Sequence, residues 1–318
     1  MPGRIQLAVV DLGSNSFHLV VAELRGGQLY TIEHLREQTQ IANGLEGDNL
    51  SAAAQSRALA CLERFSRYIR DLPHSQVSIA GTYTLRKAHN LKEFLNKAEA
   101  ILGHPVRIIT GEEEAEVIYK GVIHSGGLTD NLRLVLDIGG GSTEIILGKN
   151  DHPLLLNSLE LGCVRLAQEF FNTASAPMWI NADFQKAYIS ACNILAPLRN
   201  GYWQKGWQEC WGTSGTLDAI THVLMAHHWV KEPSIDRRGL ENLRRYLEKH
   251  DHLSLADLPG LTPERASVFA SGLAILCAFF DVFEVQQVRY SSGGLREGLL
   301  YELAEHHGAD REVALHFV

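Results

Sequence analysis

The sequence predicts an α/β protein made of two related domains. Its 318 residues are enough for two hydrophobic cores, and short apolar runs alternate with amphipathic segments, as in α/β domains. Two segments, DLGSNSFHLV (11–20) and DIGGGSTEII (137–146), share Asp, Gly and Ser at their first, third and sixth positions. Each segment lies between apolar runs, so we interpret the pair as an internal duplication in which each domain contains strand, turn and strand.

The first domain is expected to open with three successive strands, followed by alternating helices and strands. Gly26 and Gly27 predict a tight hairpin turn between the second and third strands. Ser51 is a good helix N-cap, and apolar residues recur at helical spacing as far as Ile69. The expected strands are 5–10, 17–24, one from Leu29, 77–80 and 106–109, and the expected helices are the one capped by Ser51 and 91–102.

The pattern restarts after a turn-rich break at 124–131, and the second half is expected to be more helical. The expected strands are 132–136, 144–147, 154–159, 209–211 and 288–290, and the expected helices are 183–198 (ending before Gly201), one from Leu217, 263 to about 283, and one from Leu295. We expect domains at 1–124 and 125–300, with a C-terminal helix of about 301–318 packed back on the first domain.

Composition argues against several classes of function. The formal net charge is 29 − 37 = −8, whereas non-specific binding to nucleic acid or to a membrane surface needs a basic surface. The first apolar run is too short for a signal peptide, and the longest later run, 273–280, is far shorter than a membrane span. The five cysteines form no C-x-x-C pair, so neither a zinc site nor a disulfide framework is expected. We therefore expect a cytoplasmic protein that binds neither nucleic acid nor membrane.

The two repeated loops are candidate phosphate-binding sites. A phosphate chain needs several N–H donors at short range, and glycine lets the backbone approach it. Each loop follows an aspartate, Asp11 or Asp137, that can hold a metal ion against phosphate oxygens. The alternative, that each glycine-rich segment only turns the chain, is weakened by the match between the two loops. The loop residues are Gly13, Ser14, Asn15 and Ser16 in the first repeat, and Gly139, Gly140, Gly141, Ser142 and Thr143 in the second.

Three further motifs each allow a chemical and a structural interpretation. GTSGT (212–216) lies between a strand and a helix, so Ser214 and Gly215 can present N–H groups to a phosphate or simply cap the helix. GEEEAE (111–116) starts a helix, where acids stabilise the helix dipole, but one carboxylate can instead act as a general base on water. Arg86, just after the strand at 77–80, can clamp phosphate oxygens or be an ordinary surface arginine.

These motifs together resemble those of the exopolyphosphatase/guanosine pentaphosphate phosphohydrolase family, in the family's order across residues 9–300. The resemblance implies two ribonuclease H-like domains of the actin, sugar kinase and Hsp70 ATPase superfamily with a cleft between them. Many members continue into a C-terminal helical domain similar to HD phosphohydrolases, and this chain is expected to be a short form without it. The stretches that carry the resemblance are DLGSNSFHL, TYTLRKA, TGEEEAEVIYKGV, DIGGGSTE, LGCVRL, GTSGTL, GLTPERA, SGLAIL and SGGLREG.

The resemblance also implies roles for the candidate residues. Glu114 is expected to activate water, and Arg86 is expected to hold the phosphate chain. Glu144, which stands where the first repeat has His18, is expected to support catalysis and to bind metal. Asp11 and Asp137 are the other expected metal ligands, with Mg²⁺ or Mn²⁺ as the cofactor.

The expected reaction is release of orthophosphate from the terminal phosphoanhydride bond of inorganic polyphosphate or guanosine pentaphosphate by direct attack of water. The expected partners are these substrates, and a homodimer is the oligomer considered. One alternative is an ATP-dependent kinase of the same superfamily, and another is a non-catalytic nucleotide-binding sensor. The acids at 112–114 favour the hydrolase because they suit the activation of water.

Overall fold

The chain divides into two compact units. The computed structural model describes residues 4–171, 181–249, 258–309 and 314–317. Unit 1 comprises Met1–Leu128 and Gly293–Val318, and unit 2 comprises Thr129–Ser292. The helix α11 (Leu295–His306), which the expected boundary at residue 300 would cut, belongs wholly to unit 1.

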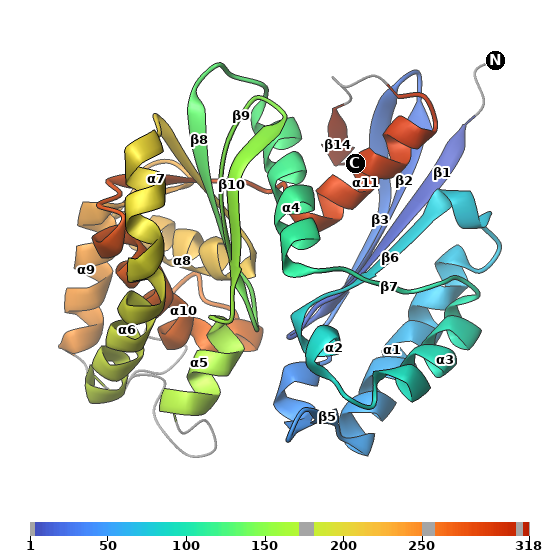
Figure 1. Cartoon of the computed structure of the whole chain (residues 1–318), viewed down its shortest axis with the longest axis horizontal. Helices are drawn as coiled ribbons and strands as arrows, with labels where there is room; N and C mark the ends of the chain where they lie inside the picture. The colour runs from blue at the N-terminus through green and yellow to red at the C-terminus, as the bar shows by residue number, and fades with distance from the viewer. Residues whose placement is uncertain (1–3, 172–180, 250–257, 310–313, 318) are drawn as a thin grey trace. The chain divides into compact units, whose positions relative to one another are not determined.

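Unit 1 is built on a single six-stranded sheet (Figure 1). Its strands are β1 (Ile5–Leu12), β2 (Phe17–Arg25), β3 (Gln28–Glu37), β6 (Val77–Gly81), β7 (Arg107–Ile108) and β14 (Leu315–Phe317). They lie in the order β14-β3-β2-β1-β6-β7, with β1, β2 and β3 antiparallel and β6 and β7 parallel to β1. Gly26 and Gly27 both have positive φ in the turn from β2 to β3, so the predicted hairpin is confirmed.

Helices cover both faces of this sheet. They are α1 (Ala52–Ile69), α2 (Tyr83–Lys87), α3 (Leu91–Leu102), α4 (Gly111–Gly126) and α11, with short segments η1 (Ile41–Gly44), β4 (Leu45–Glu46), β5 (Asn49–Leu50) and η2 (His74–Gln76). One face packs on α1 and α3 through a core that includes Phe65 and Phe94, and the other packs on α11 through Leu299. α4 crosses α11 so closely that a Cβ on Gly121 would overlap the carbonyl oxygen of Gly294, which requires glycine there.

Unit 2 repeats the strand order of unit 1. Its strands are β8 (Leu132–Ile138), β9 (Thr143–Lys149), β10 (His152–Leu159), β11 (Glu209–Thr213), β12 (Ser234–Asp236) and β13 (Gln287–Tyr290). The order β10-β9-β8-β11-β13 matches β3-β2-β1-β6-β7 of unit 1, and the antiparallel and parallel pairings match as well. The two repeated sequence segments therefore occupy equivalent places in two sheets of ribonuclease H-like topology.

Helices contribute most of the hydrophobic core of unit 2, which lies against one face of its sheet. Its helices are α5 (Cys163–Phe170), α6 (Asn181–Leu195), η3 (Ala196–Leu198), α7 (Arg199–Lys205), α8 (Gly215–Ala226), α9 (Arg237–Glu248) and α10 (Pro263–Val282). By length and composition alone α10 could cross a membrane, but 72% of its apolar stretch is buried. It packs against α6, α5 and α8, so its apolar character is that of a core helix.

Several elements differ from the prediction. The helix expected at 183–198 ends at Leu195, and after η3 a helix that we did not expect, α7, runs through Gly201. The expected break at 124–131 begins late because α4 continues to Gly126. The C-terminal segment is not a helix of about 301–318: α11 ends at His306, and β14 extends the sheet by pairing with β3, a long-range contact that local pattern does not reveal.

Candidate active site

The first repeated loop follows the carboxyl end of β1 and is held by backbone hydrogen bonds. The Gln40 and Ala42 amides donate to the carbonyl oxygens of Asn15 (2.9 Å) and Ser14 (3.0 Å). Gln40 adopts a left-handed conformation, with φ of 49°, which is costly for a residue other than glycine. A Cβ on Gly13 would lie 2.9 Å from the Ser16 carbonyl oxygen, so the turn also requires glycine. These contacts fix the course of the loop.

Three buried polar atoms around this loop have no hydrogen-bond partner among the described residues. They are the Asp11 Oδ1, Asn15 Nδ2 and Ser16 Oγ atoms. A buried polar atom left unpaired costs about 1–3 kcal/mol, so proteins normally pair such atoms. An acceptor from a carboxylate beside two donors fits a ligand that combines a hard cation with phosphate oxygens.

The Asp11 carboxyl group resists ionisation. Burial is the main cause and raises its pKa to about 7; Arg296 lowers the pKa, whereas Glu114 and Glu297 raise it further. A divalent cation bound to this carboxyl group would replace the proton and favour the charged form.

The four acids at the start of α4 occupy different environments. The Thr110 side chain accepts from the Glu113 amide (3.1 Å), and the Glu113 carboxylate accepts from the Thr110 amide (2.7 Å), forming a capping box. Glu112 and Glu116 are exposed. Glu114 alone is buried, with 7% of its surface exposed. The structural interpretation of this motif therefore applies to Glu113, and the capping box does not involve Glu114.

Arg86 is paired with Glu114 rather than solvated at the surface. It lies on α2, and its Nη1 donates to Glu114 Oε2 (2.7 Å) and to the Ile109 carbonyl oxygen (2.8 Å). Burial raises the pKa of Glu114, and Arg86 partly opposes this effect. A carboxyl group with a raised pKa is a stronger base, which suits proton abstraction from water.

Thr84, which the sequence analysis did not single out, connects α2 to the loop. Its hydroxyl donates to Ser14 Oγ at 2.7 Å, and only 1% of Thr84 is exposed. The signal was within TLRKA, two residues before Arg86, but a threonine there does not reveal its distant partner. Through α2, the Arg86–Glu114 pair and the loop thus form one connected group within unit 1.

The second repeated loop is also held through its carbonyl oxygens. The Gly139 amide closes the turn onto the Ser142 carbonyl oxygen (2.9 Å). The first amides of α5, Cys163 and Val164, donate to the carbonyl oxygens of Gly139 and Gly140 at 2.9 Å. The sequence analysis missed α5 and the glycine before it, Gly162, where a Cβ would overlap both Gly140 and the Gly141 nitrogen.

The side chains of the second repeat have distinct partners. Asp137 and Glu144 are cross-strand partners, as Asp11 and His18 are in unit 1. Glu144 is 1% exposed and accepts from Ser158 Oγ at 2.7 Å. The Thr143 hydroxyl donates to the Leu161 carbonyl oxygen, which is a structural role. In the described parts of the chain, no three His, Cys, Asp or Glu side chains form a ready metal cluster.

The Ser214–Gly215 motif forms a helix cap. Ser214 is the N-cap of α8, and its side chain accepts from the Thr216 amide at 3.2 Å. Its φ of 95° is unusual for a residue with a Cβ. A Cβ on Gly215 would meet the Arg265 guanidinium, which is the end of a flexible side chain and would have to move. The structural alternative for this motif is thus realised for the Ser214 hydroxyl.

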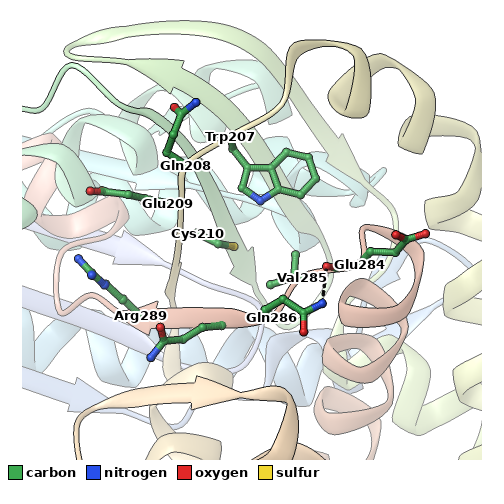
Figure 2. A pocket seen from close by; sticks show the side chains of 9 residues that line it. Trp207, Gln208, Glu209, Cys210, Glu284, Val285, Gln286 and Arg289 are labelled. Atoms are coloured by element: carbon green, nitrogen blue, oxygen red, sulfur yellow. Dashed lines mark hydrogen bonds between the residues drawn. The ribbon is translucent and has the colours of Figure 1, made fainter.

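Figure 2 shows a cavity of about 260 Å³ in unit 2 that is separate from these loops. It lies at the amino ends of β11 and β13, whereas Ser214 follows the carboxyl end of β11. The Glu209 carboxylate is already bonded to Asn131, Arg133 and Trp211. The cavity is therefore not part of the candidate site. Its lining residues are Trp207, Gln208, Glu209, Cys210, Glu284, Val285, Gln286, Gln287 and Arg289.

A family profile and two known sequences place this chain among the same group of phosphatases. The profile of the Ppx/GppA phosphatase family matches residues 20–307. A guanosine-5'-triphosphate,3'-diphosphate pyrophosphatase of Pseudoalteromonas translucida is 40% identical over 311 residues, covering 97% of this chain and 61% of that protein. The protein of the same name from Vibrio cholerae O395 is 41% identical over 300 residues, covering 94% of this chain and 59% of that protein. This chain thus spans about three-fifths of the length of these relatives.

Solved structures agree on the fold. An exopolyphosphatase of Cytophaga hutchinsonii superposes with a TM-score of 0.84 at 23% identity, covering 95% of this chain and 98% of that one. A Ppx/GppA family member of Aquifex aeolicus superposes with a TM-score of 0.78 at 22% identity, covering 97% and 100%. The expected fold class, an α/β protein of two ribonuclease H-like domains, is confirmed.

Proposed function

The chain belongs to the Ppx/GppA phosphatase family, and on that premise we propose that it hydrolyses the terminal phosphoanhydride bond of guanosine pentaphosphate or inorganic polyphosphate. The observation that carries the proposal is the partly buried Glu114–Arg86 pair, which α2 connects to a loop whose donors include two without partners among the described residues. Guanosine pentaphosphate is the first choice because the relatives at 40–41% identity are named for it. Polyphosphate is the second choice, because a solved structure of the same fold is named an exopolyphosphatase.

Glu114 is the proposed general base. Arg86 engages Oε2 and leaves Oε1 to accept a hydrogen bond from water, since the described residues provide no other partner for that oxygen. The water oxygen attacks the terminal phosphorus as its proton passes to Glu114. The bond from that phosphorus to the bridging oxygen breaks, and guanosine tetraphosphate or a shortened polyphosphate leaves with the electron pair.

The remaining candidate residues are proposed to stabilise negative charge. Both hydrogen bonds that Arg86 makes to the described residues use Nη1, so its other nitrogens are available to a phosphate oxygen. The donors of Ser14, Asn15 and Ser16 are proposed to bind phosphate oxygens. We propose the same for the backbone at 214–215 and for the loop at 139–143, apart from the Gly139 amide and the Thr143 hydroxyl, which already donate within unit 2. Ser142, like the first-loop side chains, is buried, with 4% exposed.

Asp11 in unit 1 and, separately, Asp137 and Glu144 in unit 2 are the proposed metal ligands, and the Asp11 oxygen that has no partner among the described residues fits this role. Mg²⁺ is the proposed ion and Mn²⁺ the alternative, since carboxylate oxygens suit both. Mg²⁺ commonly binds one or two carboxylates together with substrate phosphates, so a ready cluster of protein ligands is not required. When bound, the ion would neutralise phosphate charge. The proposed substrate class supports a cytoplasmic location.

The test is phosphate release by the wild type, Glu114→Gln and Glu112→Gln, measured on guanosine pentaphosphate, polyphosphate and ATP, with Mg²⁺ or with chelator. Glu112 belongs to the same acid run but is exposed, so it controls for loss of charge near the helix start. We expect Glu114→Gln to lose about 100-fold or more in rate and Glu112→Gln to stay within about 2-fold.

Three outcomes would contradict the proposal. Activity of Glu114→Gln near that of the wild type would exclude Glu114 as the base. ATP consumption only when an acceptor is added would indicate the kinase. Tight binding of guanosine pentaphosphate without phosphate release would indicate the sensor.

A further inference from the structure

We infer that Thr84 is a positioning residue that turns the Ser14 hydroxyl proton toward a phosphate oxygen of the substrate. The inference rests on the proposed function, because it assigns a donor direction within the same loop. It concerns only residues of unit 1, which α2 and the loop after β1 bring together.

The direction of the Ser14 O–H bond follows from the number of hydroxyl protons that the Thr84–Ser14 pair contains. Each hydroxyl has one proton and can accept through its oxygen. Thr84 places its proton between the two oxygens by donating to Ser14 Oγ at 2.7 Å. The Ser14 proton must therefore point elsewhere, and among the described residues Ser14 Oγ has no second hydrogen-bond partner. An anionic oxygen at this loop would accept a hydrogen bond from the Ser14 hydroxyl.

Burial keeps the arrangement in place. Only 1% of Thr84 and 5% of Ser14 is exposed, so water competes poorly for the bond between them. The Ala42 amide fixes the Ser14 backbone by donating to its carbonyl oxygen at 3.0 Å. The next two residues, Asn15 and Ser16, carry buried atoms, Nδ2 and Oγ, for which the described residues provide no partner. Three consecutive side chains thus offer donors at one place, and Thr84 sets the direction of the first.

The competing explanation is that the bond serves only to satisfy two buried hydroxyls. In that case loss of the Thr84 hydroxyl would lower the stability of the fold and leave substrate binding and turnover unchanged. Kinetic constants therefore separate the two explanations, provided that the folded state is checked in parallel.

The experiment compares Thr84→Val, which keeps the shape and removes the hydroxyl, with Thr84→Ser, which keeps the hydroxyl. Thr31→Val is the matched control, because Thr31 is also buried and its Oγ1 has no partner in the described part of the chain, but it lies within β3 at its pairing with Ala22. We expect Thr84→Val to lower kcat/KM about 10-fold or more, the scale of one hydrogen bond to a charged group. Thr84→Ser is expected to recover most of the activity, and Thr31→Val to match the wild type.

Ser14→Ala and the Thr84→Val/Ser14→Ala double variant complete the test. If Thr84 acts through Ser14, the double variant will be no less active than Ser14→Ala alone. Multiplicative losses, or Thr84→Val with wild-type kcat/KM, would overturn the inference. A thermal unfolding scan shows whether each variant is folded, and Thr84→Ser gives a folded comparison if Thr84→Val is not. Failure of the proposed function would appear separately, as a wild type that releases no phosphate.

Discussion

Replacing Asp11 by asparagine is expected to change how the stability of the protein depends on pH. Burial raises the pKa of this carboxyl group from its ordinary value of 3.8 to about 7 in the folded protein. Between these two values the unfolded chain loses the proton while the folded protein keeps it. Folding stability contributed by this group is therefore fully present below pH 3.8 and is lost as the pH rises through 7.

The size of the effect follows from the difference in pKa. About three pKa units at about 1.36 kcal/mol each give a loss of about 4 kcal/mol between pH 4 and pH 8. Asparagine does not titrate, so the stability of Asp11→Asn relative to the wild type should rise by an amount of this order over that range. Water entry or relaxation around an ionised Asp11 would reduce the difference, and we expect at least about 2 kcal/mol.

Urea unfolding at pH values from 4 to 8, without divalent ions, measures this difference. Asp71→Asn is the control, because Asp71 is an exposed aspartate of the same unit. Added Mg²⁺ should stabilise the wild type at pH 8 more than it stabilises Asp11→Asn, because the ion compensates the buried charge. Parallel pH profiles for the wild type and Asp11→Asn would refute the burial argument, and equal stabilisation by Mg²⁺ would remove Asp11 from the metal site.

Two further substitutions test the packing of unit 2 by urea unfolding. Gly162→Ala should destabilise the protein by about 1–3 kcal/mol, because the new Cβ would overlap Gly140. Gly201→Ala should stabilise it by about 0.5–1 kcal/mol, because Gly201 lies in α7 with open space around it. Equal effects of the two substitutions would contradict the overlap at Gly162. Tyr202→Phe should cost about 1 kcal/mol because the Tyr202 hydroxyl donates to the Ile145 carbonyl oxygen at 2.7 Å, and a wild-type midpoint would show that this bond contributes nothing.

Local sequence pattern predicted much of the first domain. Ser51 caps α1, and the strong periodicity of α3 gives its bounds correctly at Leu91–Leu102. α9 was missed although Leu240, Leu243 and Leu247 recur at helical spacing, because arginines and glutamates dominate the segment. β14 was missed because three residues carry little pattern, and its pairing with β3 is a long-range contact.

Part of the candidate site could also be predicted, because some of its residues belong to local sequence patterns. Glycine-rich loops after strands are local features, so residues 13–16 and 139–143 could be located from the sequence. Sequence alone could not show which acid of the run at 112–114 is buried, because that depends on the packing of α4 near Arg86. It also could not show that Ser214 caps α8 or that Thr84 reaches Ser14, which lies 70 residues earlier.

The main-chain bonds that hold the two repeated loops bear on how this protein can evolve. Backbone amides of Gln40 and Ala42 in unit 1, and of Cys163 and Val164 in unit 2, fix the loop carbonyl oxygens without using any loop side chain. The frame of each loop is therefore inherited independently of the side chains it displays. Substitutions at 14–16 can therefore change the side chains that the loop displays while its backbone course persists.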